Sequence, residues 1–411
     1  MMKHISYAAA IFVGMIAVMG CGGPKKQSAQ QGAVHPAARA KVDTALVSRL
    51  KKFDAAPRPK GNFGFYVYDL TADKPVCGAN SRVAQSSASC LKLLTGVAGF
   101  HLLGTNYAYP TRLYIRGKIV DGCLHGDVTF KGLLDPQLNE PDLRMFTDAL
   151  KRRGIRRFDG KLVADLLLHY PVKSEEHWYP WDLSFSRYGL LYKGAPKVRT
   201  ALRDAFRRAG FQVADSQVVV GRMPGGSRRL FTFRRSVDLV VRRMWKNSSN
   251  TQATSLLYTI GYAVSPKDSL PLAGVRYLRR FMRKELGLRD TSLVLHDGCG
   301  LCTHNHLSPE ALVAVLRYGY AHEPIRRRLY SLLAVSGVDG TLRAELSDKR
   351  LKGMVHGKTG TLSHPYGISS LAGICRGADG HELAFAIMDT DMSVLDARVL
   401  QRKLCLAMTG R

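Results

Sequence analysis

Acidic residues are scarce in this chain. It has 32 Asp and Glu against 61 Lys and Arg, which gives a formal net charge of +29. A surface this basic attracts polyanions. The basic residues are spread along the whole length and form neither one block nor a finger-like motif, so we do not expect a nucleic-acid-binding protein. The charge favours anionic lipid or cell-wall polymer as the partner, and plain solubility is the alternative.

Long hydrophobic runs are also missing. The apolar run Ala8–Met19 is too short to span a membrane comfortably, which argues against a transmembrane helix. It follows a short basic start and ends in small residues before Cys21, a pattern that resembles a bacterial lipoprotein signal in which Cys21 is acylated. An ordinary signal peptide with an incidental cysteine is the alternative. We expect a signal peptide at residues 1–20, a flexible tether at 21–41, and an exported, membrane-anchored body facing the periplasm.

Paired cysteine motifs are few. Apart from Cys21 there are seven cysteines, an odd number with no regular disulfide framework. The pair Cys299 and Cys302 has no second CxxC partner, which argues against a four-cysteine metal site, and Thr303 separates it from the next histidine, which excludes a haem-attachment motif. We expect a local disulfide or two small buried thiols here, with no metal and no cofactor.

Strands lie near both ends of the chain, with helices between them. The helices that apolar spacing predicts cover residues 42–53, 90–103, 141–153, 197–209 and 395–408, and the strands cover 62–70, 161–169, 354–361, 367–375 and 382–389. This order implies an α+β fold in which the N-terminal strand joins the C-terminal sheet. From residue 111 onward, short predicted strands alternate with turns, a pattern that differs from the segments before it. We therefore expect an inserted mixed α/β domain at 105–232 within a main domain formed by 42–104 and 233–411.

A nucleophile motif begins the predicted helix at residue 90. In Ser89-x-x-Lys92 the two residues share a helix face, so the amine of Lys92 can act as a base on the Ser89 hydroxyl. The backbone N–H of Ser89 also lies at the positive end of the helix dipole, which suits an oxyanion. The motif alone is weak, because Ser48-x-x-Lys51 repeats it on what we interpret as solvated helix surface.

Two later motifs add the remaining groups. Ser248-x-Asn250 is the only S-x-N in the chain and lies at a predicted helix start. There the hydroxyl of Ser248 can pass on a proton and the Asn250 amide can bind a peptide carbonyl. Lys358-Thr359-Gly360 is the only KTG and lies on a predicted strand. Its ammonium and hydroxyl can hold a carboxylate, and its glycine allows substrate backbone to approach.

Three such motifs in this order are those of penicillin-binding proteins and class A β-lactamases. The chain resembles the D-alanyl-D-alanine carboxypeptidases and endopeptidases of the penicillin-binding protein 4 type, peptidase family S13, over nearly everything after the tether. The matching segments are ASCLKLLTGVAG, DGCLHGDVTFKGLLDPQL, KNSSNTQATSLL, DGCGLCTHNHLSP and GKTGTLSHPYGISSLAG. The resemblance implies a transpeptidase-like (β-lactamase-like) core, with a helical subdomain beside a five-stranded antiparallel sheet, interrupted by an insertion between the first two motifs.

The resemblance also implies a role for each position. Ser89 is the acylated nucleophile and Lys92 its base; Ser248 and Asn250 shuttle protons and position substrate; Lys358 and Thr359 hold the terminal carboxylate; Gly360 and Asp297 complete the substrate-binding set; and the backbone N–H groups of Ser89 and Thr361 form the oxyanion hole. Lys92 must be neutral to act as base, and we expect the nearby Lys358 ammonium together with partial burial to lower its pKa.

The chain departs from the family pattern at one segment. The family reads DGSGLSR where this chain has Asp297–Thr303, so both serines are cysteines and Thr303 stands where an arginine often contacts the third residue of the substrate. A preference for diaminopimelate is therefore left open. The insertion also looks shortened, since the chain enters the helix at residue 197 soon after Trp181.

The predicted function is a serine D-Ala-D-Ala carboxypeptidase, a D,D-endopeptidase, or both. It acts on peptidoglycan stem peptides through an acyl-enzyme and is inhibited by β-lactam antibiotics. One alternative is a β-lactamase, although no Glu-containing loop resembles the class A deacylation element. Another is a non-catalytic, wall-binding lipoprotein that retains the fold. Self-association as a homo-oligomer is left open.

Overall fold

The computed structural model describes residues 41–172, 178, 188–363 and 367–411. The predicted signal peptide, Cys21 and nearly all of the tether lie outside this part of the chain. Within it, none of the helices combines the length and apolarity that crossing a bilayer requires.

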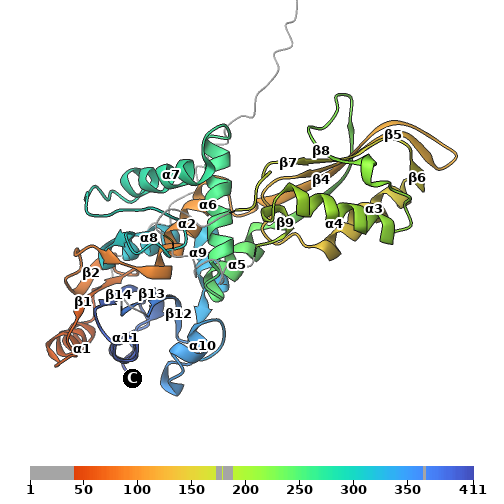
Figure 1. The fold of residues 1–411 in the computed structure, drawn as a ribbon. Helices are drawn as coiled ribbons and strands as arrows, with labels where there is room; N and C mark the ends of the chain where they lie inside the picture. Colours follow the sequence, from red (N-terminus) through yellow and green to blue (C-terminus); the bar gives the residue numbers. More distant parts are fainter. Residues whose placement is uncertain (1–40, 173–177, 179–187, 364–366) are drawn as a thin grey trace, which may run out of the picture. The chain divides into compact units, whose positions relative to one another are not determined.

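The main domain is built on a six-stranded antiparallel sheet in the order β11-β12-β13-β14-β1-β2 (Figure 1). Its strands are β1 (Asn62–Asp69), β2 (Lys74–Ala79), β11 (Ala334–Val335), β12 (Val355–Leu362), β13 (Ile368–Arg376) and β14 (Glu382–Thr390). The N-terminal strand pairs with the C-terminal one, as Phe65 with Ile387, which confirms the predicted closure of the sheet. The sheet has one strand more than the expected five, and its edge strand β11 pairs only with His356 and Gly357 of β12.

The two faces of this sheet pack against two different cores. Alternate residues of a strand point to opposite faces, so one strand contributes side chains to both cores. Along β14, Leu383, Phe385 and Ile387 pack with α1 (Thr44–Ala55) and α11 (Val394–Thr409). The smaller side chains between them, such as Ala384 and Ala386, face the opposite core. Figure 1 shows α1 and α11 on one side of the sheet and α8 on the other. A strand whose residues are apolar on both faces is typical of a central position in a sheet that is covered on both sides.

The second core is mostly helical. Its helices are α2 (Leu91–Leu103), α5 (Val237–Lys246), α6 (Asn250–Val264), α7 (Leu270–Lys284), α8 (Pro309–Ala321) and α9 (Glu323–Leu332). The first ten residues of α2 are all buried, because α5, α6, α7 and α8 surround it. A Cβ at Gly96 would overlap the ring of Trp245, and the indole Nε1 donates to the carbonyl of Lys92 at 2.8 Å. The helix that follows the nucleophile is thus locked in place.

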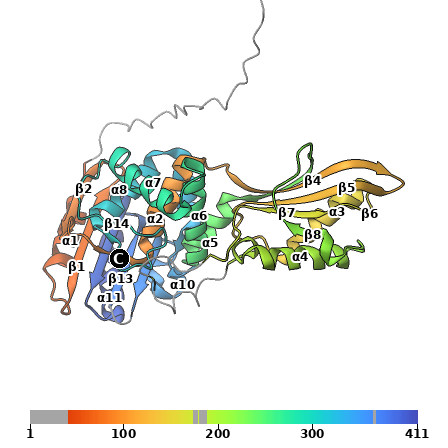
Figure 2. The ribbon, with the colours of Figure 1, turned by 45° about the horizontal axis from the view of Figure 1, so that its top comes forward.

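The segment predicted as an inserted domain, called the inserted domain below, contains a second sheet in the order β8-β7-β5-β4-β9, with α3 and α4 packed along it (Figure 2). Its elements are β4 (Ala108–Val120), β5 (Cys123–Gly132), α3 (Arg144–Arg152), β6 (Arg157–Phe158), β7 (Leu162–Leu166), α4 (Ala195–Arg208), β8 (Val218–Val220) and β9 (Arg228–Ser236). Strands β4, β5 and β9 are antiparallel, whereas β5, β7 and β8 are parallel. Strand β9 continues past the expected boundary at residue 232, because it pairs with β4 as far as Ala108 and Ser236.

Candidate active site

The three motifs come from three separate elements and meet in one place. Ser89 lies in a short 3₁₀ turn, Ala88–Cys90, directly before α2, while Asn250 is the first residue of α6 and Lys358 lies on β12. The Nζ of Lys92 is 2.7 Å from Ser89 Oγ and 2.8 Å from Asn250 Oδ1. The other lysine, Lys358, donates to Ser248 Oγ at 2.8 Å. The five residues expected to carry the chemistry thus form two hydrogen-bonded groups, one around each lysine.

The hydrogen bonds around Lys92 place its amine where a general base must lie. Its third partner is the carbonyl oxygen of Cys299, at 2.5 Å. The Asn250 and Cys299 oxygens can only accept, so each takes one proton from Lys92. An ammonium donates to all three oxygens, whereas a neutral amine, with two protons and one lone pair, would turn the lone pair to Ser89 Oγ and accept the hydroxyl proton. This is the arrangement that a general base needs before it takes the hydroxyl proton.

Burial lowers the pKa of both lysines. Lys92 is fully buried, and the loss of solvation lowers its pKa, opposed by the nearby Cys299, Asp297 and Cys90. Lys358 is also fully buried, and its pKa falls to about 7, first through burial and then through the charge of Lys92. Burial is thus the main cause for Lys92; the sequence argument named it together with the Lys358 charge.

Left-handed backbone occurs beside the nucleophile and at the second serine. Ala88 has φ 44° and Ser248 has φ 55°, a conformation that costs a non-glycine residue about 1 kcal/mol or more. Such strain persists only where surrounding contacts hold it. At Ala88 these contacts include the Ser370 hydroxyl, which donates to Ser87 O at 2.6 Å, and the Cys90 thiol, which donates to Lys358 O at 3.0 Å. The nucleophile turn is therefore fastened to the adjacent strands.

Gly360 is needed for packing. A Cβ at this position would lie 2.5 Å from Ser87 O and 3.0 Å from Ser89 N, so glycine lets β12 approach the nucleophile turn. The room for substrate backbone that the sequence predicts at this glycine stays a prediction. Thr359 is buried, with its hydroxyl 2.9 Å from that of Thr341, and Thr361 is half-buried on the same strand.

Asp297 is placed differently from the substrate-binding role predicted for it. Its carboxylate is only 1% exposed and accepts hydrogen bonds from six donors. These are the backbone N–H groups of Cys299 (3.0 Å), Gly300 (2.7 Å) and Cys302 (2.9 Å) and the side chains of Asn305 (3.0 Å), Trp178 (2.9 Å) and Cys299 (3.6 Å). A carboxylate with its lone pairs occupied in this way has none left for a ligand. Asp297 instead shapes the loop that presents the Cys299 carbonyl to Lys92.

Cys299 and Cys302 are both buried and are thiols in the structure, which is the second of the two alternatives that their spacing allowed. The Sγ of Cys302 lies 3.7 Å from His304 Nδ1. Sequence reasoning missed the Cys299 carbonyl and Trp245 as supports of the base. No short motif marks either of them, because one acts through its backbone and the other through long-range packing.

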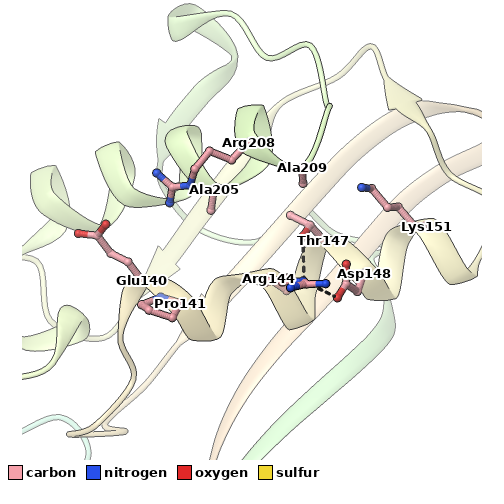
Figure 3. A pocket seen from close by; sticks show the side chains of 9 residues that line it. All are labelled: Glu140, Pro141, Arg144, Thr147, Asp148, Lys151, Ala205, Arg208 and Ala209. Atoms are coloured by element: carbon pink, nitrogen blue, oxygen red, sulfur yellow. Dashed lines mark hydrogen bonds and ion pairs between the residues drawn. The ribbon is translucent and has the colours of Figure 1, made fainter.

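A separate groove of about 610 Å³ lies between α3 and α4 of the inserted domain (Figure 3). Charged side chains line it, among them Arg144 and Asp148, which form an ion pair at 3.5 Å. None of the motif residues contributes to this groove, so we do not place the acyl-transfer chemistry there.

Comparison with known proteins shows the family and the fold of the chain. The model of the D-Ala-D-Ala carboxypeptidase 3 (S13) family matches residues 33–188 and 191–408. The D-alanyl-D-alanine carboxypeptidase DacB of Haemophilus influenzae is 22% identical over 80% of this chain and 85% of its own. The crystal structure of penicillin-binding protein 4 from that species has a TM-score of 0.72 at 21% identity, covering 88% of this chain and 98% of its own. For a predatory endopeptidase of Bdellovibrio bacteriovorus, in complex with an immunity protein, the TM-score is 0.61 at 16% identity, with 86% and 94% covered. Because the family model spans most of the sequence, the chain belongs to the D-Ala-D-Ala carboxypeptidase 3 (S13) family.

Proposed function

We propose that this family member cleaves the D-Ala-D-Ala bond of peptidoglycan stem peptides through an acyl-enzyme on Ser89. The observation that carries the proposal is the position of Lys92 Nζ, which lies in a fully buried site between Ser89 Oγ, Asn250 Oδ1 and the Cys299 carbonyl. A serine whose hydroxyl donates to a desolvated, neutral amine is an activated nucleophile.

Acylation uses the groups in a fixed order. Lys92 takes the hydroxyl proton as Ser89 Oγ attacks the carbonyl of the penultimate D-alanine, and the backbone N–H groups of Ser89 and Thr361 stabilise the oxyanion. The proton then reaches the leaving amine through Ser248, whose hydroxyl accepts from Lys358. The leaving group is free D-alanine in a carboxypeptidase reaction and a crosslinked stem peptide in an endopeptidase reaction. Water hydrolyses the ester with Lys92 again as base.

Lys358 suits the recognition of the substrate's terminal carboxylate. Its pKa of about 7 means that it is only partly charged in the free enzyme, and a bound carboxylate would stabilise the ammonium. Thr359 follows it on the same strand and supplies a hydroxyl. β-Lactams carry a carboxylate at the matching place, so they should acylate Ser89 in the same way.

The test compares wild type with two serine variants. Fluorescent penicillin should label wild type and Ser48→Ala equally, because Ser48 belongs to the second S-x-x-K copy on α1, and it should fail to label Ser89→Ala. Digestion of purified sacculi by the wild type, followed by mass analysis, separates released D-alanine from cleaved crosslinks. A wild type that takes no label and releases no product would leave only the non-catalytic wall-binding alternative. Rapid turnover of a chromogenic cephalosporin would favour the β-lactamase alternative.

Export and membrane anchoring form a separate part of the proposal. The family acts on the cell wall, and the sequence around Cys21 resembles a lipoprotein signal. We propose that Cys21 carries the lipid anchor. Replacement of Cys21 by Ser should move the protein from the membrane fraction to the soluble periplasmic fraction, and unchanged fractionation would argue for an ordinary signal peptide or another mode of attachment.

A further inference from the structure

A cluster of three metal-ligand side chains lies in the inserted domain, apart from the acyl-transfer site. Strands β4 and β5 are joined by the two-residue turn Asp121-Gly122, whose φ angles of 45° and 74° are those of the tight hairpin turn that Asp-Gly favours. Cys123 and His125 follow on β5 and, being two residues apart on a strand, lie on the same face. The tight turn therefore fixes the backbone directly before Cys123.

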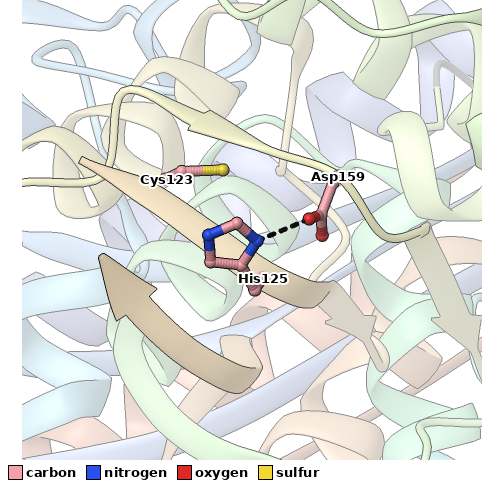
Figure 4. Close-up of side chains that lie close together, drawn as sticks. All are labelled: Cys123, His125 and Asp159. Atoms are coloured by element: carbon pink, nitrogen blue, oxygen red, sulfur yellow. Dashed lines mark hydrogen bonds and ion pairs between the residues drawn. The ribbon is translucent and has the colours of Figure 1, made fainter. Parts of the chain in front are cut away.

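Backbone pairing brings the third side chain to the other two. Strand β6 runs parallel to the start of β5, with Cys123 opposite Arg157, and Asp159 follows directly after β6. The N–H of Asp159 donates to Leu124 O at 3.3 Å, and its Oδ1 accepts from Gly126 N at 2.9 Å. Its Oδ2 lies 2.8 Å from His125 Nδ1 (Figure 4). The carboxylate is thus positioned by main-chain hydrogen bonds.

One ligand atom from each of Cys123, His125 and Asp159 lies within 4.8 Å of the other two. Zinc binds thiolate at about 2.3 Å and imidazole or carboxylate at about 2.0–2.2 Å, usually in a tetrahedron. In such a tetrahedron the ligand atoms lie about 3.4–3.7 Å apart. The distance between His125 Nδ1 and Asp159 Oδ2, now 2.8 Å, would therefore have to increase slightly, and the metal ion would take the place of the hydrogen bond between them. Thiolate together with imidazole selects zinc-like ions over magnesium or calcium.

Exposure of the cluster leaves access for an ion and for a fourth ligand. The side chains of His125 and Asp159 are 54% and 57% exposed, whereas Cys123 is buried beneath them. A second group within reach of an ion is Asp69, Asp379 and His381, but it lacks sulfur. Asp69 Oδ1 already accepts the N–H groups of Thr71 and Ala72. That group therefore serves as a control.

We propose that Cys123, His125 and Asp159 bind one Zn²⁺-like ion, with water in the fourth position. Binding converts the Cys123 thiol to thiolate and releases its proton to solvent. The ion would link β5 to the segment after β6 and so stabilise this end of the inserted domain. This site goes beyond the proposed function and is independent of Ser89.

The test is a Co²⁺ titration of the full chain after treatment with a chelator. We expect one equivalent of Co²⁺ to give the thiolate-to-cobalt charge-transfer absorption and tetrahedral visible bands, both displaced by Zn²⁺. Cys123→Ser should abolish the charge-transfer band, and His125→Ala and Asp159→Asn should each weaken binding by about tenfold or more. The controls Cys77→Ser and His381→Ala should bind like wild type. Labelling of Ser89 by fluorescent penicillin reports whether each variant is folded.

Three outcomes would overturn the proposal. The first is a wild type without the band. The second is a band that survives Cys123→Ser. If Cys302→Ser then abolishes the band, the ion lies at the loop near Lys92. The third is a folded His125→Ala protein with unchanged affinity. His125 is exposed, so this variant keeps the test decisive even if the buried Cys123 does not tolerate serine.

Discussion

The indole Nε1 of Trp245 donates to the main-chain carbonyl of Lys92 at 2.8 Å, so α5 holds the base through its backbone. The ring reaches this carbonyl because position 96, one turn further along α2, is glycine. Trp245 therefore holds the backbone of Lys92 in place without taking part in the chemistry, as supporting groups do for the reacting side chains of other enzymes.

Replacing Gly96 with alanine should disrupt this support. The new methyl group would overlap the Trp245 ring in a fully packed core, and overpacking of this kind costs about 1–3 kcal/mol. We expect a lower midpoint in urea unfolding and slower acylation by penicillin. Gly99→Ala is the matched control, because its methyl group would meet only the side chain of Leu256, at 3.1 Å or more, and should be milder. Equal effects of the two substitutions would refute this account.

Asp297→Asn should slow acylation although the substitution is nearly isosteric. An amide can still accept on Oδ1, but its NH₂ group would face the N–H groups of Cys302 and Trp178, which now donate to Oδ2. The loop should then move the Cys299 carbonyl away from Lys92. We expect acylation to slow by about tenfold or more, with each leftover buried donor costing about 1–3 kcal/mol.

A double variant separates this positioning role from substrate binding. Trp178→Phe removes one of the two opposing donors, so it should restore part of the acylation rate in the Asp297→Asn background. If Asp297 instead contacted substrate directly, the single variant would raise KM with little change in kcat, and Trp178→Phe would rescue nothing.

Substrate binding should weaken above neutral pH. The pKa of Lys358 is lowered to about 7 in the folded protein, so the ammonium that holds the carboxylate is lost as pH rises through this value. KM for a peptide with a free terminal carboxylate should then rise by about tenfold per pH unit above about 7. Lys358→Arg keeps its charge at all working pH values and should flatten this rise. A KM that is flat for wild type between pH 6 and about 9 would contradict the assignment.

Asp389→Asn should stabilise the protein at alkaline pH. This buried carboxyl accepts from Gln401 at 3.3 Å, its Oδ1 has no partner among the described residues, and burial raises its pKa to about 7. In the unfolded chain it ionises near 3.8. The folded state therefore binds more protons between these values, so its stability falls as pH rises through them. The cost reaches about 2–4 kcal/mol above pH 7.

Urea unfolding at pH 5 and pH 8 measures this effect. The asparagine variant should gain stability relative to wild type at both values and clearly more at pH 8, because only part of the cost has accrued at pH 5. Gln401→Ala offers a contrast, because it removes a hydrogen bond and should destabilise at both values. A gain for Asp389→Asn that does not change with pH would rule out titration as its cause.

Local patterns in the sequence determined much of this protein. Apolar periodicity predicted a helix over 42–53 and strands over 354–361 and 382–389, and the structure has α1, β12 and β14 within two residues of those bounds. Helix α3 begins at Arg144 rather than 141, because Pro141 lies in a 3₁₀ turn with its own capping box. Three short motifs, with their flanking segments, indicated the family because each depends on residues only two or three apart.

Only the tertiary structure decided how the base is held and what several single residues do. The carbonyl of Cys299 bonds to Lys92 through the main chain, so no side chain at position 299 reveals it. Asp297 has an acidic side chain in a family segment, yet its six hydrogen bonds can be seen only in the folded loop. Asp159 meets His125 across 34 residues, through the parallel pairing of β5 and β6. Local spacing encodes helix faces and strand alternation, whereas contacts made by backbone atoms and distant strands depend on how the whole chain packs.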